Sequence, residues 1–342
     1  MAWFPTEEVV LFTGRALNPS ATTVVNTDFP IDGTGWERIR IHLHGVLAAV
    51  VTPFADGLYR FLKGITLRTS RGEVLYDSVP GMAVYRLNQF FYHSDPHHDR
   101  AVAAGATIDA ILDLPLGFPF LNRPEDTYLD TSNYSNVELQ LQTGSLDVFA
   151  PAAPATCPVT FGISIIRTLS ALGGDKKSKP VNHPYVKAYQ NIATGTALQW
   201  DLESSMDLGL FGFFIQNHDI LLVEGAVPFC HPAAGNVDHI ATVTFRDSLR
   251  SYVDAVPMTS FQKTRKDLTP YQFYDGQAPA IVATEIATSR LGIYPHFFVR
   301  NGSVNEQFAT GRKSLIQARF TLNAAAGTER ADLCVWGQRA MR

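Results

Sequence analysis

Apolar and polar residues alternate along much of the chain, and this pattern predicts strands. In residues 39–44, Ile-Arg-Ile-His-Leu-His, every second side chain is apolar. A period of two places the apolar side chains on one face of a half-buried strand. Alternating or β-branched runs predict further strands at 137–142, 158–166, 240–245, 314–320 and 333–336, and one near 191–202. Most are bounded by Gly, Pro, Asn or Asp, which favour turns.

Helical patterns are few, and they occur at matching places in the two halves. Residues 81–91 follow Asp77-Ser78-Val79-Pro80, where Ser78 suits a helix cap and Pro80 suits a first turn. Residues 258–268 follow the similar Asp254-Ala255-Val256-Pro257. Second helical segments are predicted at 106–112 and 280–291. A strand that ends in Asp-x-Val-Pro and enters a short helix is therefore predicted once per half.

The second half of the chain faintly repeats the first. The matched segments, in order, are Val51–Phe54 with Ala226–Phe229, Ile65–Ser70 with Val243–Ser248, and Asp77–Pro80 with Asp254–Pro257. Their offsets lie between 175 and 178 residues, about half of the 342-residue chain. Internal repetition at a fixed offset indicates repeated architecture. The repeat predicts two copies of one β-rich domain in tandem.

The boundary between the copies is predicted at residues 173–180, Gly-Gly-Asp-Lys-Lys-Ser-Lys-Pro, because this composition is typical of a linker. A first domain with an N-terminal arm would then cover residues 1–172, and a second domain would cover 181–342. Each has the length of an ordinary domain with its own core.

Composition narrows the functional classes. Charged residues make up 18% of the chain, below the roughly 25% of average soluble proteins. This low fraction of charged residues has two explanations: much of the surface is buried against other subunits, or the chain contains two large sandwich cores. The net charge of −4, with no basic tail, argues against specific nucleic-acid binding.

The cysteines and the apolar runs bear on the cellular location. Cys157, Cys230 and Cys334 are too widely spaced for a zinc knuckle and suit a reducing cytoplasm. The N-terminus lacks a signal-peptide pattern, and no apolar run is long enough to span a bilayer.

Two histidine patterns are candidate metal sites. His42 and His44 would share one face of a strand, as metal ligands do in cupins, but no carboxylate follows in 45–51. The alternative is a polar strand face. The cluster His93-Ser94-Asp95-Pro96-His97-His98-Asp99 holds several potential ligands. Its alternative is a solvated loop, or a loop at a subunit contact, because the second half has no equivalent.

Oxygen-rich segments are the remaining candidates. Asp130, Ser132 and Asn133 could bind calcium, although their spacing matches no EF-hand and such residues commonly join strands. Asp201 and Glu203 would form a carboxylate pair on one strand face, as glycoside hydrolysis uses. The common nucleophile, phosphate-binding, dinucleotide-binding and zinc-protease motifs do not occur. We therefore expect no catalytic, cofactor-binding or metal-binding residues, no cofactor, and no enzymatic activity.

The paired blocks 51–80 and 226–257, with the linker at 173–180, resemble the architecture of double jelly-roll major capsid proteins of tailless icosahedral viruses. This group includes membrane-containing bacteriophages and the adenovirus hexon. The resemblance implies a mainly β chain with two tandem eight-stranded jelly-roll β-sandwiches and a few short helices. It also implies a capsid subunit that stands upright in the shell and forms pseudo-hexagonal homotrimers.

The same resemblance implies a place in the virion after synthesis in the host cytoplasm. The implied partners are other copies of the chain, with minor capsid or vertex proteins and an internal membrane as further candidates. No long basic or amphipathic N-terminal arm is present, which leaves contact with a membrane or genome open. We expect exposed apolar side chains on the tall sides of the domains and polar turns between the strands.

Two other functions fit parts of the pattern. A bicupin-type metalloenzyme would bind a metal at His42 and His44 and would need equivalent ligands in the second half. A carbohydrate-binding double β-sandwich, such as a spike or lectin, would display aromatic side chains on one sheet face.

Overall fold

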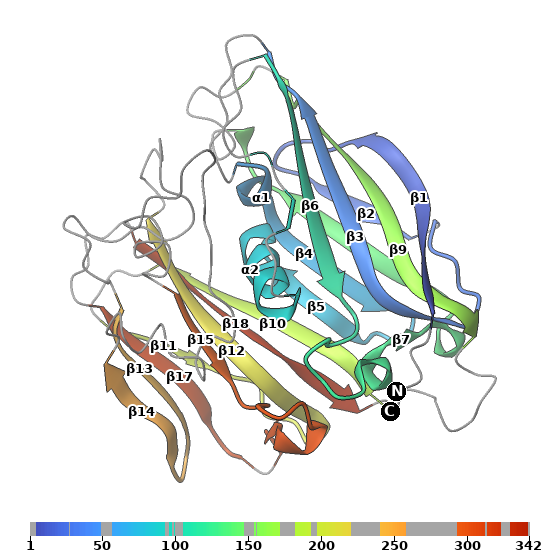
Figure 1. Cartoon of the computed structure of the whole chain (residues 1–342). Coiled ribbons are helices and arrows are strands. Elements are labelled where there is room, and N and C mark those ends of the chain that lie inside the picture. The colour runs from blue at the N-terminus through green and yellow to red at the C-terminus, as the bar shows by residue number, and fades with distance from the viewer. Residues whose placement is uncertain are drawn as a thin grey trace. The chain divides into compact units, whose positions relative to one another are not determined.

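β-strands dominate the fold, as Figure 1 shows. The computed structural model describes residues 5–26, 28–48, 57–92, 96–97, 99, 105–146, 154, 156–171, 182–192, 197–219, 240–257, 293–311, 313–322 and 329–340. Within these residues, eighteen strands are joined by two α-helices and three short 3-10 helices. The mainly β composition that the sequence predicted is confirmed.

The chain divides into two compact units. Unit 1 comprises Met1–Lys187 and Gln338–Arg342, and unit 2 comprises Ala188–Gly337. The predicted linker at 173–180 lies outside the described residues, so the predicted division of the chain at that segment stays a prediction.

The long strands β1 to β9 of unit 1 are divided between two sheets. One has the order β1-β9-β3-β6, and the other has the order β2-β8-β4-β5. The short strand β7 pairs with the beginning of β3. The bounds are β1 Thr6–Ala16, β2 Thr22–Val25, β3 Thr34–Val46, β4 Leu62–Thr69, β5 Val74–Val79, β6 Thr107–Pro115, β7 Leu129–Asp130, β8 Val137–Thr143 and β9 Val159–Ala171.

The later strands follow the same plan. Their sheet orders are β10-β18-β12-β15 and β11-β17-β13-β14, and the short strand β16 pairs with β12. β10 begins in unit 1, where Val186 and Lys187 pair in parallel with Tyr76 and Asp77 of β5. The bounds are β10 Asn182–Ile192, β11 Ala197–Asp201, β12 Leu208–Asp219, β13 Ile240–Asp247, β14 Ser251–Pro257, β15 Ile293–Phe297, β16 Phe308–Ala309, β17 Ile316–Leu322 and β18 Glu329–Ala340.

The two sets of strands match one to one. In each set, taken in chain order, the first strand lies beside the last, and the second lies beside the last but one. This is the order of an eight-stranded jelly roll, and it occurs twice, as predicted. The sequence repeat is confirmed at its central segment, because residues 65–70 and 243–248 cover the ends of β4 and β13 and each strand forms a hairpin with the next.

Alternation explains the core of unit 1. On β3, Ile39, Ile41 and Leu43 are buried, while the residues between them face outward. Helices α1 (Gly57–Phe61) and α2 (Gly81–Tyr92) lie beside the strands in Figure 1, and α2 packs against β4 and β6.

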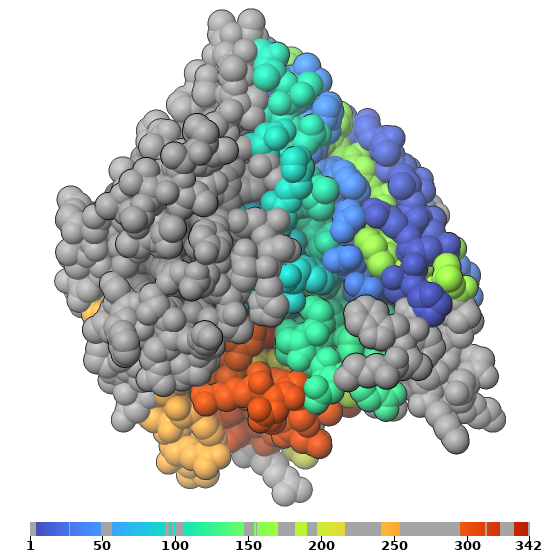
Figure 2. All heavy atoms as spheres, in the orientation of Figure 1, coloured from blue at the N-terminus to red at the C-terminus, as the bar shows by residue number. Residues whose placement is uncertain are grey.

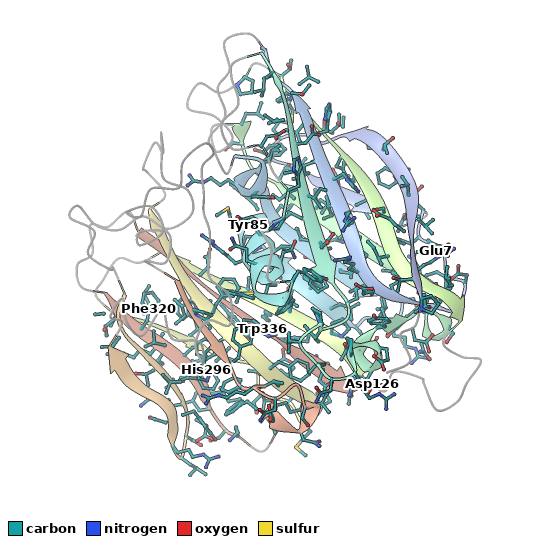
Figure 3. The ribbon with its side chains drawn as sticks, viewed as in Figure 1. Glu7, Tyr85, Asp126, His296, Phe320 and Trp336 are labelled. Carbon is teal, nitrogen blue, oxygen red and sulfur yellow. The ribbon has the colours of Figure 1, made fainter. Side chains whose placement is uncertain are left out.

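The core of unit 2 is rich in aromatic residues. Phe213 of β12 stacks on Phe245 of β13, with ring centroids 5.0 Å apart. His296 of β15 also stacks on Phe213, with ring centroids 5.3 Å apart, and it is labelled in Figure 3.

Two local predictions are wrong. Residues 106–112 were predicted to be helical, but they belong mostly to β6, because pairing of the whole of β6 with β3 overrides the local apolar spacing. Ser78 was predicted to cap α2, but it belongs to β5, has a φ of 51°, and donates its backbone N–H to Thr66 Oγ1 at 3.2 Å. The helix at 81–91 is confirmed as α2. The predicted helices at 258–268 and 280–291 lie outside the described residues.

Among the described helices, none has the length and apolar character needed to cross a membrane.

Candidate functional site

The outward face of the sheet β1-β9-β3-β6 carries a dense array of charged side chains. Figure 2 shows the surface that these four strands form, in blue, teal and yellow-green. The array, here called the β3 face, consists of Arg38, Arg40, His42 and His44 on β3 with Glu8, Asp109, Asp113 and Ser164 on the neighbouring strands. The period of two along β3 brings its four basic residues into one row.

Asp113 connects β6 to β3 through two arginines. Arg40 donates from Nε to Asp113 Oδ1 at 2.8 Å and from Nη2 to Oδ2 at 3.1 Å. Arg38 Nη1 lies 3.1 Å from Asp113 Oδ2. Bidentate pairs of this kind are stronger than single hydrogen bonds. Because the Asp113 side chain is only 10% exposed, this arrangement fixes the register of β6 on β3.

Glu8 connects β1 to the same row. Its carboxylate accepts from Ser164 Oγ at 2.6 Å and from Arg40 Nη1 at 3.1 Å. The Ser164 hydrogen bond lowers the pKa of Glu8, and Arg40 and His42 lower it further against the opposing effect of burial. Burial and the Arg40 cation lower the pKa of His42, although Glu8 opposes them. The face therefore holds Glu8 ionised and favours neutral His42.

His42 and His44 share one strand face, as the sequence predicted, but they bind different neighbours. His42 Nε2 lies 3.3 Å from Ser164 Oγ on β9, and His44 Nδ1 lies 2.7 Å from Asp109 Oδ1 on β6. In the described part of the chain, no three His, Cys, Asp or Glu residues are arranged to hold a metal ion. The polar strand face is the alternative that these contacts favour.

The other candidates from the sequence make local contacts. His97 Nε2 lies 4.0 Å from Asp99 Oδ1, while His93 and His98 lie outside the described residues. Asp130 Oδ1 accepts from the backbone N–H of Ser132 at 3.0 Å and from its hydroxyl at 2.6 Å, which caps a short 3-10 helix (Thr131–Asn133). Asn133 donates to the Asp130 carbonyl at 3.3 Å. These hydrogen bonds stabilise the turn of the loop itself.

The predicted carboxylate pair does not form on one strand. β11 ends at Asp201, so Glu203 lies beyond the strand. Asp201 accepts from Gln317 at 2.8 Å, and the Glu203 backbone N–H donates to Tyr189 at 3.3 Å. Asp201 therefore joins two strands of one sheet, which is a structural role.

A second cluster lies at the turn between β13 and β14. Asp247 Oδ2 accepts from Lys313 Nζ at 2.5 Å and from the Tyr252 hydroxyl at 2.6 Å. Its Oδ1 accepts from the backbone N–H groups of Leu249 and Arg250 at 2.8 and 2.9 Å. These bonds, the one to Lys313 first, hold the pKa of Asp247 far below its ordinary value. No pattern in the sequence predicts this cluster, because Lys313 is 66 residues from Asp247.

The face of β12 that carries Phe214, opposite to the face with Phe213, is apolar and buried. Phe214 and Phe297 lie beside Trp336, with ring centroids 6.2 and 5.3 Å from it, and all three side chains are buried. Trp336 is labelled in Figure 3. Gly212 leaves room for this indole, since a Cβ there would lie 2.4 Å from Trp336. The two equivalent faces therefore differ in chemistry.

Neither known protein families nor curated protein sequences match this chain. Solved structures do match, over almost its whole length. The major capsid protein of bacteriophage PM2 is similar with a TM-score of 0.58 at 10% identity, covering 99% of this chain and 98% of its own. The major capsid protein of STIV, the Sulfolobus turreted icosahedral virus, has a TM-score of 0.62 at 11% identity, with coverage of 98% and 97%.

The PBCV-1 protein VP54 has a TM-score of 0.63 at 10% identity, covering 98% of this chain and 94% of its own. This chain has the double jelly-roll fold. The resemblance that the sequence predicted is therefore confirmed at the level of the fold. Within the double jelly roll, the β3 face belongs to the sheet that contains the first and last strands of the first jelly roll.

Proposed function

We propose that this chain is a major capsid subunit, a structural protein that forms homotrimers and tiles an icosahedral virus shell. The observation that carries the proposal is the occurrence of one jelly-roll strand order twice in a single chain. The proposal is supported by the structural similarity to capsid proteins, which extends over nearly the full length of this chain and of each capsid protein. Under this proposal the chain is not an enzyme.

Geometry explains why such a chain suits a shell. Three chains with two similar domains each place six similar sandwiches around one axis, so the trimer has a pseudo-hexagonal outline. A ring with threefold symmetry needs heterologous contacts, in which different surfaces of the same chain meet.

The proposal assigns partners and location. The principal partner is the chain itself, in the trimer and between neighbouring trimers, and the site of action is the virion after synthesis in the host cytoplasm. Minor capsid or vertex proteins and an internal membrane are additional proposed partners, whereas specific nucleic-acid binding is not expected from a net charge of −4.

The metalloenzyme alternative gains no support from the described contacts, because His44 binds Asp109 and His42 lies against Ser164. Multi-angle light scattering and electron microscopy of concentrated protein test the proposal. We expect trimers or larger particles. A monodisperse monomer at every salt concentration and pH would overturn it.

A further inference from the structure

The turn between β13 and β14 presents an apolar side chain to solvent. Leu249 is 91% exposed, the highest value among the exposed large apolar side chains of the described residues. The expectation that turns stay polar is wrong here. A single exposed leucine is ordinary on a protein surface, so the surroundings of Leu249 decide its meaning.

This turn is rigidly anchored. Asp247, whose side chain is 3% exposed, binds the backbone of the turn through one oxygen and Tyr252 and Lys313 through the other. The guanidinium of Arg250 lies 4.6 Å from the centre of the Tyr252 ring. Leu249 is therefore presented from a preorganised turn, which lowers the entropy lost on binding.

Two further apolar side chains lie at the same end of the sandwich. Asp247 pairs with Ile316, so Leu315, which is 38% exposed, lies next to the turn. Met206 is 73% exposed and packs over Gly311, where a Cβ would lie 3.0 Å from its sulfur. The loop of Met206 is tied to this end because Ser204 Oγ donates to the Lys313 carbonyl at 2.7 Å. Leu249, Leu315 and Met206 are here called the apolar tip.

The equivalent turn of the first jelly roll is polar. Thr69 corresponds to Asp247, since they end the matched strands β4 and β13. The first turn is one residue longer, because the N–H of Thr69 donates to the Glu73 carbonyl at 3.0 Å and that of Asp247 donates to the Arg250 carbonyl at 2.9 Å. Arg71 then stands where the second turn has Leu249. The apolar tip is thus present in one repeat only, which suits a heterologous contact between unlike surfaces.

We propose that the apolar tip docks on a different surface of a second copy of this chain. The inference rests on the proposed function and deepens it by naming a contact region. A protein partner suits the tip because its apolar side chains lie beside charges of both signs, with Asp207 next to Met206 and Arg250 next to Leu249. The exposed Arg250 beside Leu249 adds specificity for a carboxylate on the partner.

The test compares Leu249→Ser with Arg71→Ser, its matched control in the first turn. Both variants should fold with the far-UV circular dichroism of the wild type. Leu249→Ser should raise the concentration for half-assembly, measured by light scattering, at least about tenfold, whereas Arg71→Ser should leave it unchanged. Unchanged assembly of Leu249→Ser overturns the inference and leaves the proposed function intact. A wild-type chain that never assembles overturns both.

Photo-crosslinking covers the case in which Leu249→Ser fails to fold. A photoreactive phenylalanine at position 249 should give products of twice the 37.6 kDa chain mass. Assembled protein without such products would contradict the inference. Flotation with vesicles of phosphatidylcholine and phosphatidylglycerol in equal parts tests the lipid alternative. Wild-type flotation that Leu249→Ser abolishes would also overturn the inference.

Discussion

Arg40 and Phe214 occupy the same position in the two jelly rolls. The short strands fix the alignment, since β7 pairs with β3 at Trp36 and β16 pairs with β12 at Leu210, four residues earlier in each case. Arg40 faces Asp113 across the sheet, and Phe214 faces Pro295. The backbone plan is shared, while one side chain joins an ion pair at the surface and the other is fully buried.

This relationship predicts unequal costs of truncation. Phe214→Ala should lower the free energy of unfolding by about 3–5 kcal/mol, because it removes a buried aromatic ring. Arg40→Ala should cost about 1 kcal/mol, because Arg38 still pairs with Asp113 and the partly exposed Arg40 side chain exchanges its ion pairs for water at little net cost. Denaturant titrations followed by circular dichroism measure both. Equal losses of stability would contradict the difference in burial between these two equivalent positions.

Asp247→Asn should weaken the turn between β13 and β14. The amide keeps an oxygen for the backbone N–H groups but loses the charge that binds Lys313, at a cost of about 2–3 kcal/mol at neutral pH. Asp247 has a lowered pKa in the folded chain, so its contribution is complete above the ordinary Asp pKa near 4 and is lost as pH falls further. The difference between variant and wild type should therefore shrink in urea titrations at about pH 3, and a constant difference would contradict this role.

His296 should make the second jelly roll sensitive to acid. Burial first, and the Arg300 cation second, lower its pKa from 6.5 to about 4. The unfolded chain then binds the proton more readily than the folded one, so stability falls as pH drops from 6.5 towards 4, by up to about 3 kcal/mol. His296→Phe should flatten this part of the pH profile of thermal unfolding. Phe298→Leu, which alters a neighbouring ring and removes no titrating group, should not. If His296→Phe left the pH profile unchanged, His296 would not be the cause of the acid sensitivity.

Proteolysis tests the predicted domain boundary. Trypsin should cut first within Lys176–Lys179, because that stretch has the composition of a linker. Mass spectrometry of the first fragments identifies the cut, and assembled particles provide the control in which neighbours shield the segment. First cleavage at another site in the unassembled chain would argue against the boundary.

The sequence predicted the strands and helices that are specified by residues close together in the chain. The strand at 39–44 and the helix at 81–91 were found because alternation and turn residues lie within a few positions of each other. The central segment of the sequence repeat was recognisable for a related reason. Residues 65–70 and 243–248 keep similar side chains because each enters the same hairpin.

Features that depend on distant partners were missed. Asp109 lies within the predicted helix at 106–112, whereas pairing of β6 with β3 places it opposite His44. The row of basic residues could have been extended to Arg38 and Arg40, since they share the period of His42. Nothing local relates Lys313 to Asp247, because only the pairing of β17 with β13 brings their segments together.

The position of β1 beside β9 has a consequence for synthesis. In its sheet, the first strand finds its neighbour in a segment that begins at Val159, roughly 150 residues later. A ribosome that adds about 5–20 residues per second needs many seconds to supply that segment. During this interval the nascent chain carries an unpaired edge, which can join strands of other chains. Rapid closure of the first jelly roll after translation of β9 is therefore a condition for a high yield of correctly folded subunits.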